Sequence, residues 1–180
     1  MTTTLRGGDN FDSAAIAASK LTGTLPAIDG GALTGNVGKV VQIREFQTST
    51  STVTTSTTSV ATDLLMSFTP KLTNSSLLVQ FSFTGYSLST SNGVEFDVWK
   101  NGTRMVMTGG GGGNAHSFLY NPLNTASRYE SHKIQFLDNV SSNSAVEYRL
   151  YTQAHSAAYS SGIQSDWGVQ SIIIMELEND

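Results

Sequence analysis

Apolar and polar residues alternate over most of the chain beyond residue 38, and this period of two is the strongest constraint on the fold. The clearest case is the run LLVQFSF, in which Leu77, Val79, Phe81 and Phe83 occupy every second position. Successive side chains of a β-strand point to opposite faces, so the run has one apolar face. The pattern predicts half-buried strands in an all-β domain.

The same alternation predicts further strands along the chain. They cover residues 41–48, 64–68, 94–98, 104–107, 116–120, 129–137, 145–154 and 169–177. Asn101 and Gly102 lie between two of these runs and favour a two-residue hairpin, because both positions of that turn need positive φ. About eight to ten strands with short turns and no long helix predict an antiparallel, jelly-roll-like β-sandwich.

The tract QTSTSTVTTSTTSVAT at residues 47–62 allows two interpretations. Its low complexity is typical of a disordered or modified Ser/Thr linker. Thr and Val have high β propensity, however, and neither Pro nor Gly interrupts the tract. We therefore expect an exposed, polar pair of strands with a turn near residues 56–59.

The last predicted strand, residues 169–177, contains three consecutive isoleucines. A strand that is apolar on both faces is expected at the centre of a sheet or at a subunit interface. Ile172 and Ile174 are therefore candidate oligomerisation residues.

Residues 20–38, KLTGTLPAIDGGALTGNVG, combine two Leu-Thr-Gly units with sparse apolar residues. One chain has too little bulk here for a core of its own, whereas three copies around an axis fill each layer. Gly and Pro would supply the tight turns between layers. The segment is predicted to be a trimeric stalk, with a semi-flexible linker as the alternative. The candidate stalk residues are Leu21, Leu25, Ile28, Leu33 and Val37.

Residues 1–19 are predicted to be an attachment segment, ahead of the stalk at 20–38 and the β head at 39–180. Asp12 or Ser13 can cap a short helix over residues 14–20, because both side chains accept hydrogen bonds from free backbone N–H groups. A helix of this length is not stable alone. The alternative is a frayed tail.

Composition excludes several classes of function. The net charge is −4 and charged residues make up 13% of the chain, without a basic cluster, which argues against nucleic-acid binding. There is no cysteine, so disulfides and thiolate metal sites are excluded. The first residues lack the apolar core of a signal peptide, and no apolar run is long enough to span a membrane.

The sequence carries no recognisable catalytic constellation. The three histidines, His116, His132 and His155, are not at metal-ligand spacings, and no G-x-S-x-G motif is present. A glycosidase needs two carboxylates facing each other across a cleft. The candidates for such a pair are Glu95, Asp97, Glu130, Asp138, Glu147 and Asp166. We expect no enzymatic activity, no metal and no cofactor.

Loops and aromatic residues are the remaining candidates for recognition. Residues 109–113 are five consecutive glycines, without the pattern of a phosphate-binding loop. Loops on a rigid β scaffold often carry binding sites, and exposed Trp and Tyr anchor contacts. The candidate receptor-binding residues are Gly111, Asn114, Tyr120, Tyr159 and Trp167. The alternatives are a plain spacer loop and packing of Trp167 beneath the last strand.

The order of the segments resembles that of a known family. A stalk with LTG and PAID is followed by GKVVQIREFQ, MSFTPKLTNSSLLVQFSF, VWKNGT and WGVQSIIIMELE. This order is similar to the tail-fibre-type structural proteins of marine and cyanobacterial phages, whose β heads are similar to trimeric C1q-like jelly rolls. The similarity covers residues 20–178 and rests on structural motifs.

The resemblance implies a homotrimeric virion protein made in the host cytoplasm. Its N-terminal segment would contact other virion proteins, and its head would project. Because the chain is short for a tail fibre, its place on the tail, the tail tip or the capsid surface stays open. An adhesin that binds a host glycan or protein receptor is the alternative function.

Overall fold

The computed structural model describes residues 39–88, 92–105, 116–121, 127–166 and 168–179, with the backbone alone at 92 and 116–121. Among these residues there is no helix. The strands, in chain order, are β1 (Val40–Thr48), β2 (Thr52–Thr54), β3 (Val60–Phe68), β4 (Ser75–Ser87), β5 (Asn92–Lys100), β6 (Thr103–Arg104), β7 (His116–Asn121), β8 (Arg128–Val140), β9 (Val146–Ala154), β10 (Ser161–Ile163) and β11 (Gln170–Glu178).

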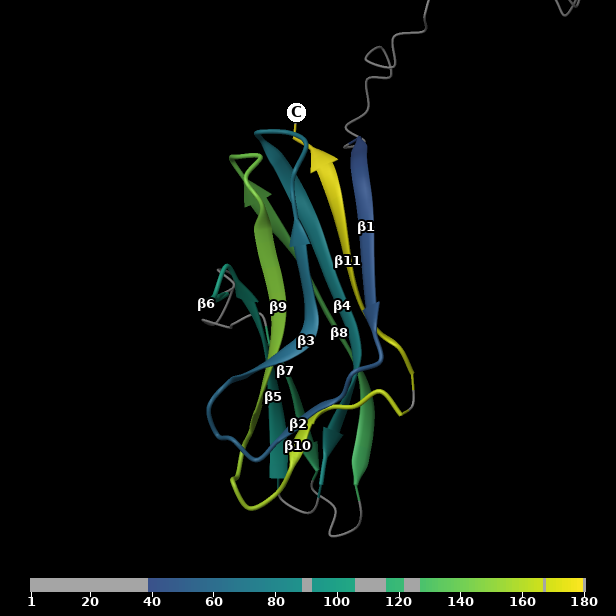
Figure 1. Ribbon diagram of the computed structural model, residues 1–180, viewed down its shortest axis with the longest axis vertical. Helices are drawn as coiled ribbons and strands as arrows, with labels where there is room; N and C mark the ends of the chain where they lie inside the picture. The colour runs from purple at the N-terminus through teal and green to yellow at the C-terminus, as the bar shows by residue number, and fades with distance from the viewer. Residues whose placement is uncertain (1–38, 89–91, 106–115, 122–126, 167, 180) are drawn as a thin grey trace, which may run out of the picture. The chain divides into compact units, whose positions relative to one another are not determined.

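The strands form two antiparallel sheets, which we call sheet A and sheet B (Figure 1). In sheet A, β4 pairs with β8 on one edge and with β11 and then β10 on the other, while β1 pairs with β11 and β2 with β10. In sheet B, β9 lies between β3 and β5. The free edge of β5 pairs with β7 and then with β6. The all-β, antiparallel prediction is confirmed.

The core lies between the two sheets and follows the predicted alternation. Every second residue of β4 is buried, including Leu77, Val79, Phe81 and Phe83. Sheet B contributes the facing side chains, among them Leu64, Phe96 and Leu150. Burial of each large apolar side chain stabilises the fold by about 1.5–3 kcal/mol, so this period of two is the main reason for the architecture.

The predicted hairpin at Asn101-Gly102 is confirmed. Asn101 has a φ of 49° and Gly102 a φ of 76°. The flanking residues pair as Trp99 with Arg104 and Lys100 with Thr103, so the turn contains two residues. Positive φ at both central positions is the conformation that matches the twist of the strands.

The Ser/Thr-rich tract forms strands, but they do not pair with each other. β2 pairs with β10, whereas β3 pairs with β9 in the other sheet. β10 accepts β2 because Gly162 has no side chain: a Cβ atom there would lie 2.1 Å from the Thr52 carbonyl oxygen. The prediction of a strand pair within the tract was wrong, since it could not include this distant partner.

The described chain begins and ends at the same end of the sandwich. The Glu178 N–H donates to the Lys39 carbonyl at 2.9 Å, and Val40 pairs with Leu177. By its internal contacts, Val37–Asp180 is one compact unit. The predicted helix at 14–20 and the predicted stalk at 20–38 lie outside the described residues.

Candidate functional site

β1 carries exposed apolar side chains on both faces, beside polar ones, and its own chain does not bury them. None of its nine residues is buried. Val40 is 46% exposed, Ile43 55% and Phe46 39%. Edge strands with exposed apolar side chains are open to pairing or packing with another chain, and globular proteins usually protect them. β1 is therefore the first candidate for a functional contact.

A register shift between Val40 and Gln42 decides which face of β1 each residue occupies. Ile43 lies opposite Met175, on the outer face of sheet A, whereas Arg44 lies opposite the buried Ile174. The alternation in the sequence predicted the strand correctly. It did not show that the inner positions of β1 would carry Gln42, Arg44 and Phe46.

An apolar row crosses the whole outer face of sheet A. The register places Ile43 of β1, Met175 of β11, Leu78 of β4 and Leu137 of β8 side by side. Leu137 is 61% exposed. We call this row and its apolar neighbours the sheet A patch, which consists of Val40, Ile43, Leu78, Leu137, Ile173, Met175 and Leu177. Contiguous exposed apolar surface of this kind is typical of an interaction site.

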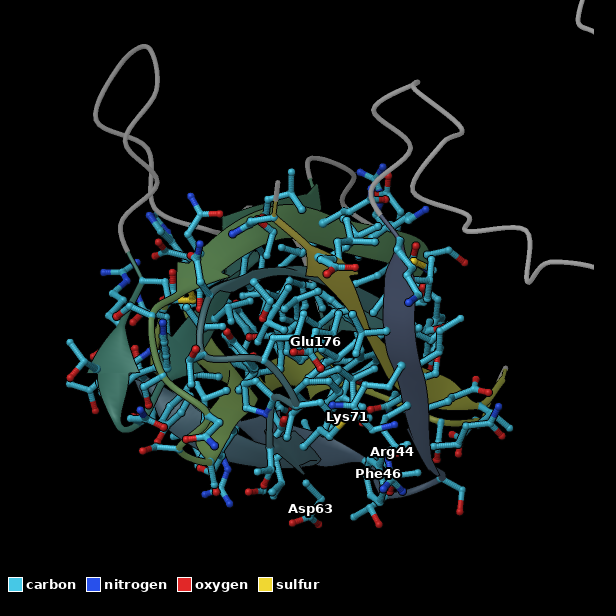
Figure 2. The ribbon with its side chains drawn as sticks, turned by 90° about the horizontal axis from the view of Figure 1, so that it is seen from above. Arg44, Phe46, Asp63, Lys71 and Glu176 are labelled. Atoms are coloured by element: carbon cyan, nitrogen blue, oxygen red, sulfur yellow. The ribbon has the colours of Figure 1, made fainter. Side chains whose placement is uncertain are left out.

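A groove runs along the inner side of β1, where the two sheets separate. Its volume is about 520 Å³, and β1 and β3 line it, with Arg44, Phe46 and Leu65 among the side chains. In Figure 2, Arg44 and Phe46 lie close together on the β1 side, while Glu176 lies farther inside the sandwich. The groove and the sheet A patch thus meet at the same uncovered strand.

Glu176 is a buried carboxylate at the inner end of this region. It accepts hydrogen bonds from the Lys71 and Leu72 N–H groups at 2.9 Å, from Ser75 Oγ at 3.0 Å and from Gln42 Nε2 at 2.7 Å. Burial tends to raise the pKa of Glu176, but these four donors outweigh it and hold the pKa below its ordinary value. Glu176 therefore ties β1 and the turn before β4 to β11. No sequence motif indicated this role.

The outer face of sheet B differs from that of sheet A, because it carries charged and aromatic side chains. The rings of Trp99 and Tyr151 stack with their centroids 4.3 Å apart. Beside them, Arg104 Nη2 donates to Glu95 at 2.7 Å and to Asp97 at 2.6 Å. Burial alone would lower the pKa of Arg104, but the two carboxylates raise it by more than burial lowers it. The pKa therefore lies above its ordinary value, and the guanidinium stays charged.

The other candidate carboxylates also have polar partners. Asp138 accepts from Tyr148 and forms an ion pair with Lys100 at 2.5 Å. Burial, together with the hydrogen bond and charge of Asp138, raises the pKa of Tyr148. The remaining partners are Arg128 for Glu130, Arg149 for Glu147 and Gln164 for Asp166.

The histidines lie in different surroundings. The ring of His132 packs against those of Phe83 and Phe96, with ring centroids 5.5 Å and 5.2 Å apart. Burial lowers the pKa of His132. His155 is exposed, and His116 lies on β7. Within the described part of the chain, no cluster of three or more His, Asp or Glu side chains has the arrangement of a metal site.

The predicted oligomerisation and receptor-binding residues are only partly within the described structure. Ile172 and Ile174 are fully buried in the core of their own chain, so of the three isoleucines only Ile173 faces outward. Tyr159 is 38% exposed in the turn before β10, and Tyr120 lies on β7. The others lie outside the described residues: Leu21, Leu25, Ile28, Leu33, Val37, Gly111, Asn114 and Trp167.

Comparison of the sequence with known proteins does not extend this description. No model of a protein family matches the sequence, and no curated protein matches it. Among the described residues, there is no helix of the length and hydrophobicity needed to cross a membrane.

Proposed function

We propose that this chain is a structural protein of a phage virion, a fibre or decoration protein that assembles as a homotrimer. The observation that carries the proposal is β1, which presents apolar side chains on both faces and has no buried residue in the single chain. Exposed apolar side chains on an edge strand favour contact with another chain. A second copy of the chain is the partner that we infer.

The sheet A patch supports the same partner. It continues from β1 across all four long strands of its sheet, so one contact would cover both the edge strand and the row beside it. Closed rings form when a patch on one copy meets a different patch on the next copy. The groove beside Phe46 and the sheet A patch are two different surfaces that share β1, which suits contacts of this kind.

The strand order adds a second line of support. The long strands are ordered β1-β11-β4-β8 in sheet A and β3-β9-β5-β7 in sheet B, two four-stranded antiparallel layers that support the expected jelly roll. Jelly rolls are frequent in viral structural proteins. In the trimer, the N-terminal attachment segment, which precedes the stalk and β1 in the chain, would contact other virion proteins.

Light scattering on the purified full chain tests the proposal. The expected result is the mass of three chains, and a uniform monomer contradicts it. The variant Ile43→Asp introduces a charge on the outer face of edge strand β1, and we expect it to dissociate the trimer. Ala61→Asp is the matched control, because Ala61 is exposed on the outer face of β3, the edge strand of sheet B. It should leave the mass unchanged.

The alternative function is an adhesin that binds a glycan or protein on the host surface. The observation that favours it is the outer face of sheet B, where aromatic and charged side chains lie together. Both functions are compatible in one virion protein, since assembly would use sheet A and recognition would use sheet B. Neither requires a catalytic residue, a metal or a cofactor.

A further inference from the structure

Six side chains on the outer face of sheet B form a continuous surface, which we call the sheet B site. The register brings Glu95 beside Gln153, Asp97 beside Tyr151, and Trp99 beside Arg104. These residues come from β5, β6 and β9, and the two-residue turn at Asn101-Gly102 holds β6 against β5. The site is therefore built on paired strands, which position side chains more rigidly than loops do.

The polar half of the site is a chain of hydrogen bonds. Ser59 Oγ donates to Gln153 Oε1 at 3.1 Å, and Gln153 Nε2 donates to Glu95 Oε2 at 2.8 Å. Arg104 then joins Glu95 to Asp97. The side chain of Asp97 is only 2% exposed, while those of Glu95 and Arg104 are 28% and 35% exposed. The Glu95 carboxylate and the Arg104 guanidinium are thus fixed side by side at the surface, and the Asp97 carboxylate that also binds Arg104 is buried.

The aromatic half lies beside this chain. Trp99 and Tyr151 stack at an interplanar angle of 20° and are both partly exposed. The row that contains Trp99 is also rich in donors without acceptors. In the part of the chain that the structure describes, Trp99 Nε1 and Arg104 Nε are shielded from solvent and have no hydrogen-bond partner. The groups of this half that a ligand can reach are the partly exposed rings of Trp99 and Tyr151.

We propose that the sheet B site binds a neutral carbohydrate. A pyranose ring has an apolar C–H face that packs on an aromatic ring, and its hydroxyl groups both donate and accept. Glu95 would accept from one hydroxyl group and Arg104 would donate to another, while the buried Asp97 carboxylate holds the guanidinium in place. Lys100 forms its ion pair with Asp138 of β8, so this face carries three carboxylates, Glu95, Asp97 and Glu147, against the two guanidinium groups of Arg104 and Arg149, and this balance disfavours an anionic ligand.

The proposal goes beyond the assembly proposed above and does not depend on it. All six residues belong to one chain, and they lie on the sheet opposite the sheet A patch. A monomer would contain the whole site. In the proposed trimer, the site would face away from the surface that sheet A uses for assembly.

Titration of the full chain with methyl glycosides of glucose, galactose and mannose tests the site. Saturation-transfer NMR and tryptophan fluorescence follow binding at up to about 50 mM, because a site for a single sugar has a Kd on the order of 1 mM. We expect saturable binding of at least one glycoside. Glu95→Gln, which keeps the shape of the side chain, should weaken binding by about tenfold or more, and Trp99→Ala should abolish it.

Glu147→Gln is the matched control, because Glu147 is a carboxylate on the same face but outside the site. It should bind like the unchanged chain. Absence of binding for all three glycosides overturns the proposal, and so does equal binding in Glu95→Gln. Binding of sodium sulfate alone also overturns it, in favour of an anion site. Light scattering on the same samples separates the two proposals, since a monomer that binds sugar contradicts only the assembly.

Discussion

The two outer faces of this sandwich have opposite chemistry. Sheet A presents the row Ile43, Met175, Leu78 and Leu137, whereas sheet B presents stacked rings beside paired charges. The inner faces of the two sheets, in contrast, share one apolar core, although polar residues such as Glu176 are also buried there. The comparison shows that burial in the core accounts for the inward-facing residues of each strand and leaves the outward-facing residues unexplained. The outer half differs between the sheets because each faces a different environment, and we infer a second copy for sheet A and an oxygen-rich ligand for sheet B.

The largest effect is expected at Glu176, which holds β1 and therefore the edge of the sheet A patch. Glu176→Ala leaves three donors, at Lys71, Leu72 and Ser75, without this acceptor, and Gln42 Nε2 keeps only its hydrogen bond to the Thr69 carbonyl. We expect the free energy of unfolding to fall by about 3 kcal/mol or more, as measured by urea denaturation. Glu178→Gln, an exposed position on the same strand, should change it by less than about 0.5 kcal/mol. Similar stability of the two variants would contradict the anchoring role.

The same residue predicts a dependence of stability on pH. The pKa of Glu176 in the folded chain lies below its ordinary value of 4.5, so the unfolded chain binds its proton first as pH falls. Its contribution is complete above pH 4.5 and declines as pH falls through the lower, folded-state pKa. Urea denaturation between about pH 6 and pH 3 should show this decline. Glu176→Gln should have a shallower slope in that range, and an identical slope would assign the decline to other carboxylates.

A smaller effect on stability is expected on the outer face of sheet B. Arg104→Ala leaves the buried Asp97 carboxylate without its guanidinium donor. We expect a loss of about 1–2 kcal/mol in thermal or urea denaturation, reduced by the partial exposure of Arg104. Assembly should not change, because Arg104 lies on the sheet opposite the sheet A patch. Dissociation of the oligomer by this variant would contradict the proposal that only sheet A is used for assembly.

The smallest effect on the head is expected from the predicted stalk. Leu21→Asp combined with Leu33→Asp should weaken the trimer or its attachment while the β head still folds, because both residues lie outside Val37–Asp180. Circular dichroism should show an unchanged strand signal, and light scattering should show a lower mass. If the assembly is unaffected, residues 20–38 are better described as a linker than as a stalk.

Much of the fold could be predicted from local pattern. The alternation at Leu77 to Phe83 predicted both a strand and its buried face, and Asn101-Gly102 predicted a hairpin with two central residues, since positive φ is a local property. The partners of the Ser/Thr-rich tract could not be predicted, because β2 pairs with a strand more than a hundred residues away and depends on Gly162.

Most of the contacts that make up the candidate sites could not be predicted from the sequence. The sequence offers Glu95 and Asp97 only as two of six candidate carboxylates. Nothing in the order of residues showed that Arg104 joins the carboxylates, or that Tyr151 stacks on Trp99. No sequence feature indicates a role for Glu176, because a single acidic residue near the end of an apolar strand is not part of a motif. Its role depends on donors more than a hundred residues away in the chain.

The sequence by itself determined the all-β class, the strand positions and the apolar face of the central strands. These follow from the two-residue period of a strand and from the burial of apolar side chains, and both are local. Only the tertiary structure decided which strands become edges and which outer faces stay uncovered. Ile172 and Ile174 illustrate this, because their neighbours in sheet A and sheet B bury them completely, while Ile43 on the adjacent strand remains exposed. Exposure is a property of neighbours, and the neighbours of a β-strand are set by long-range pairing.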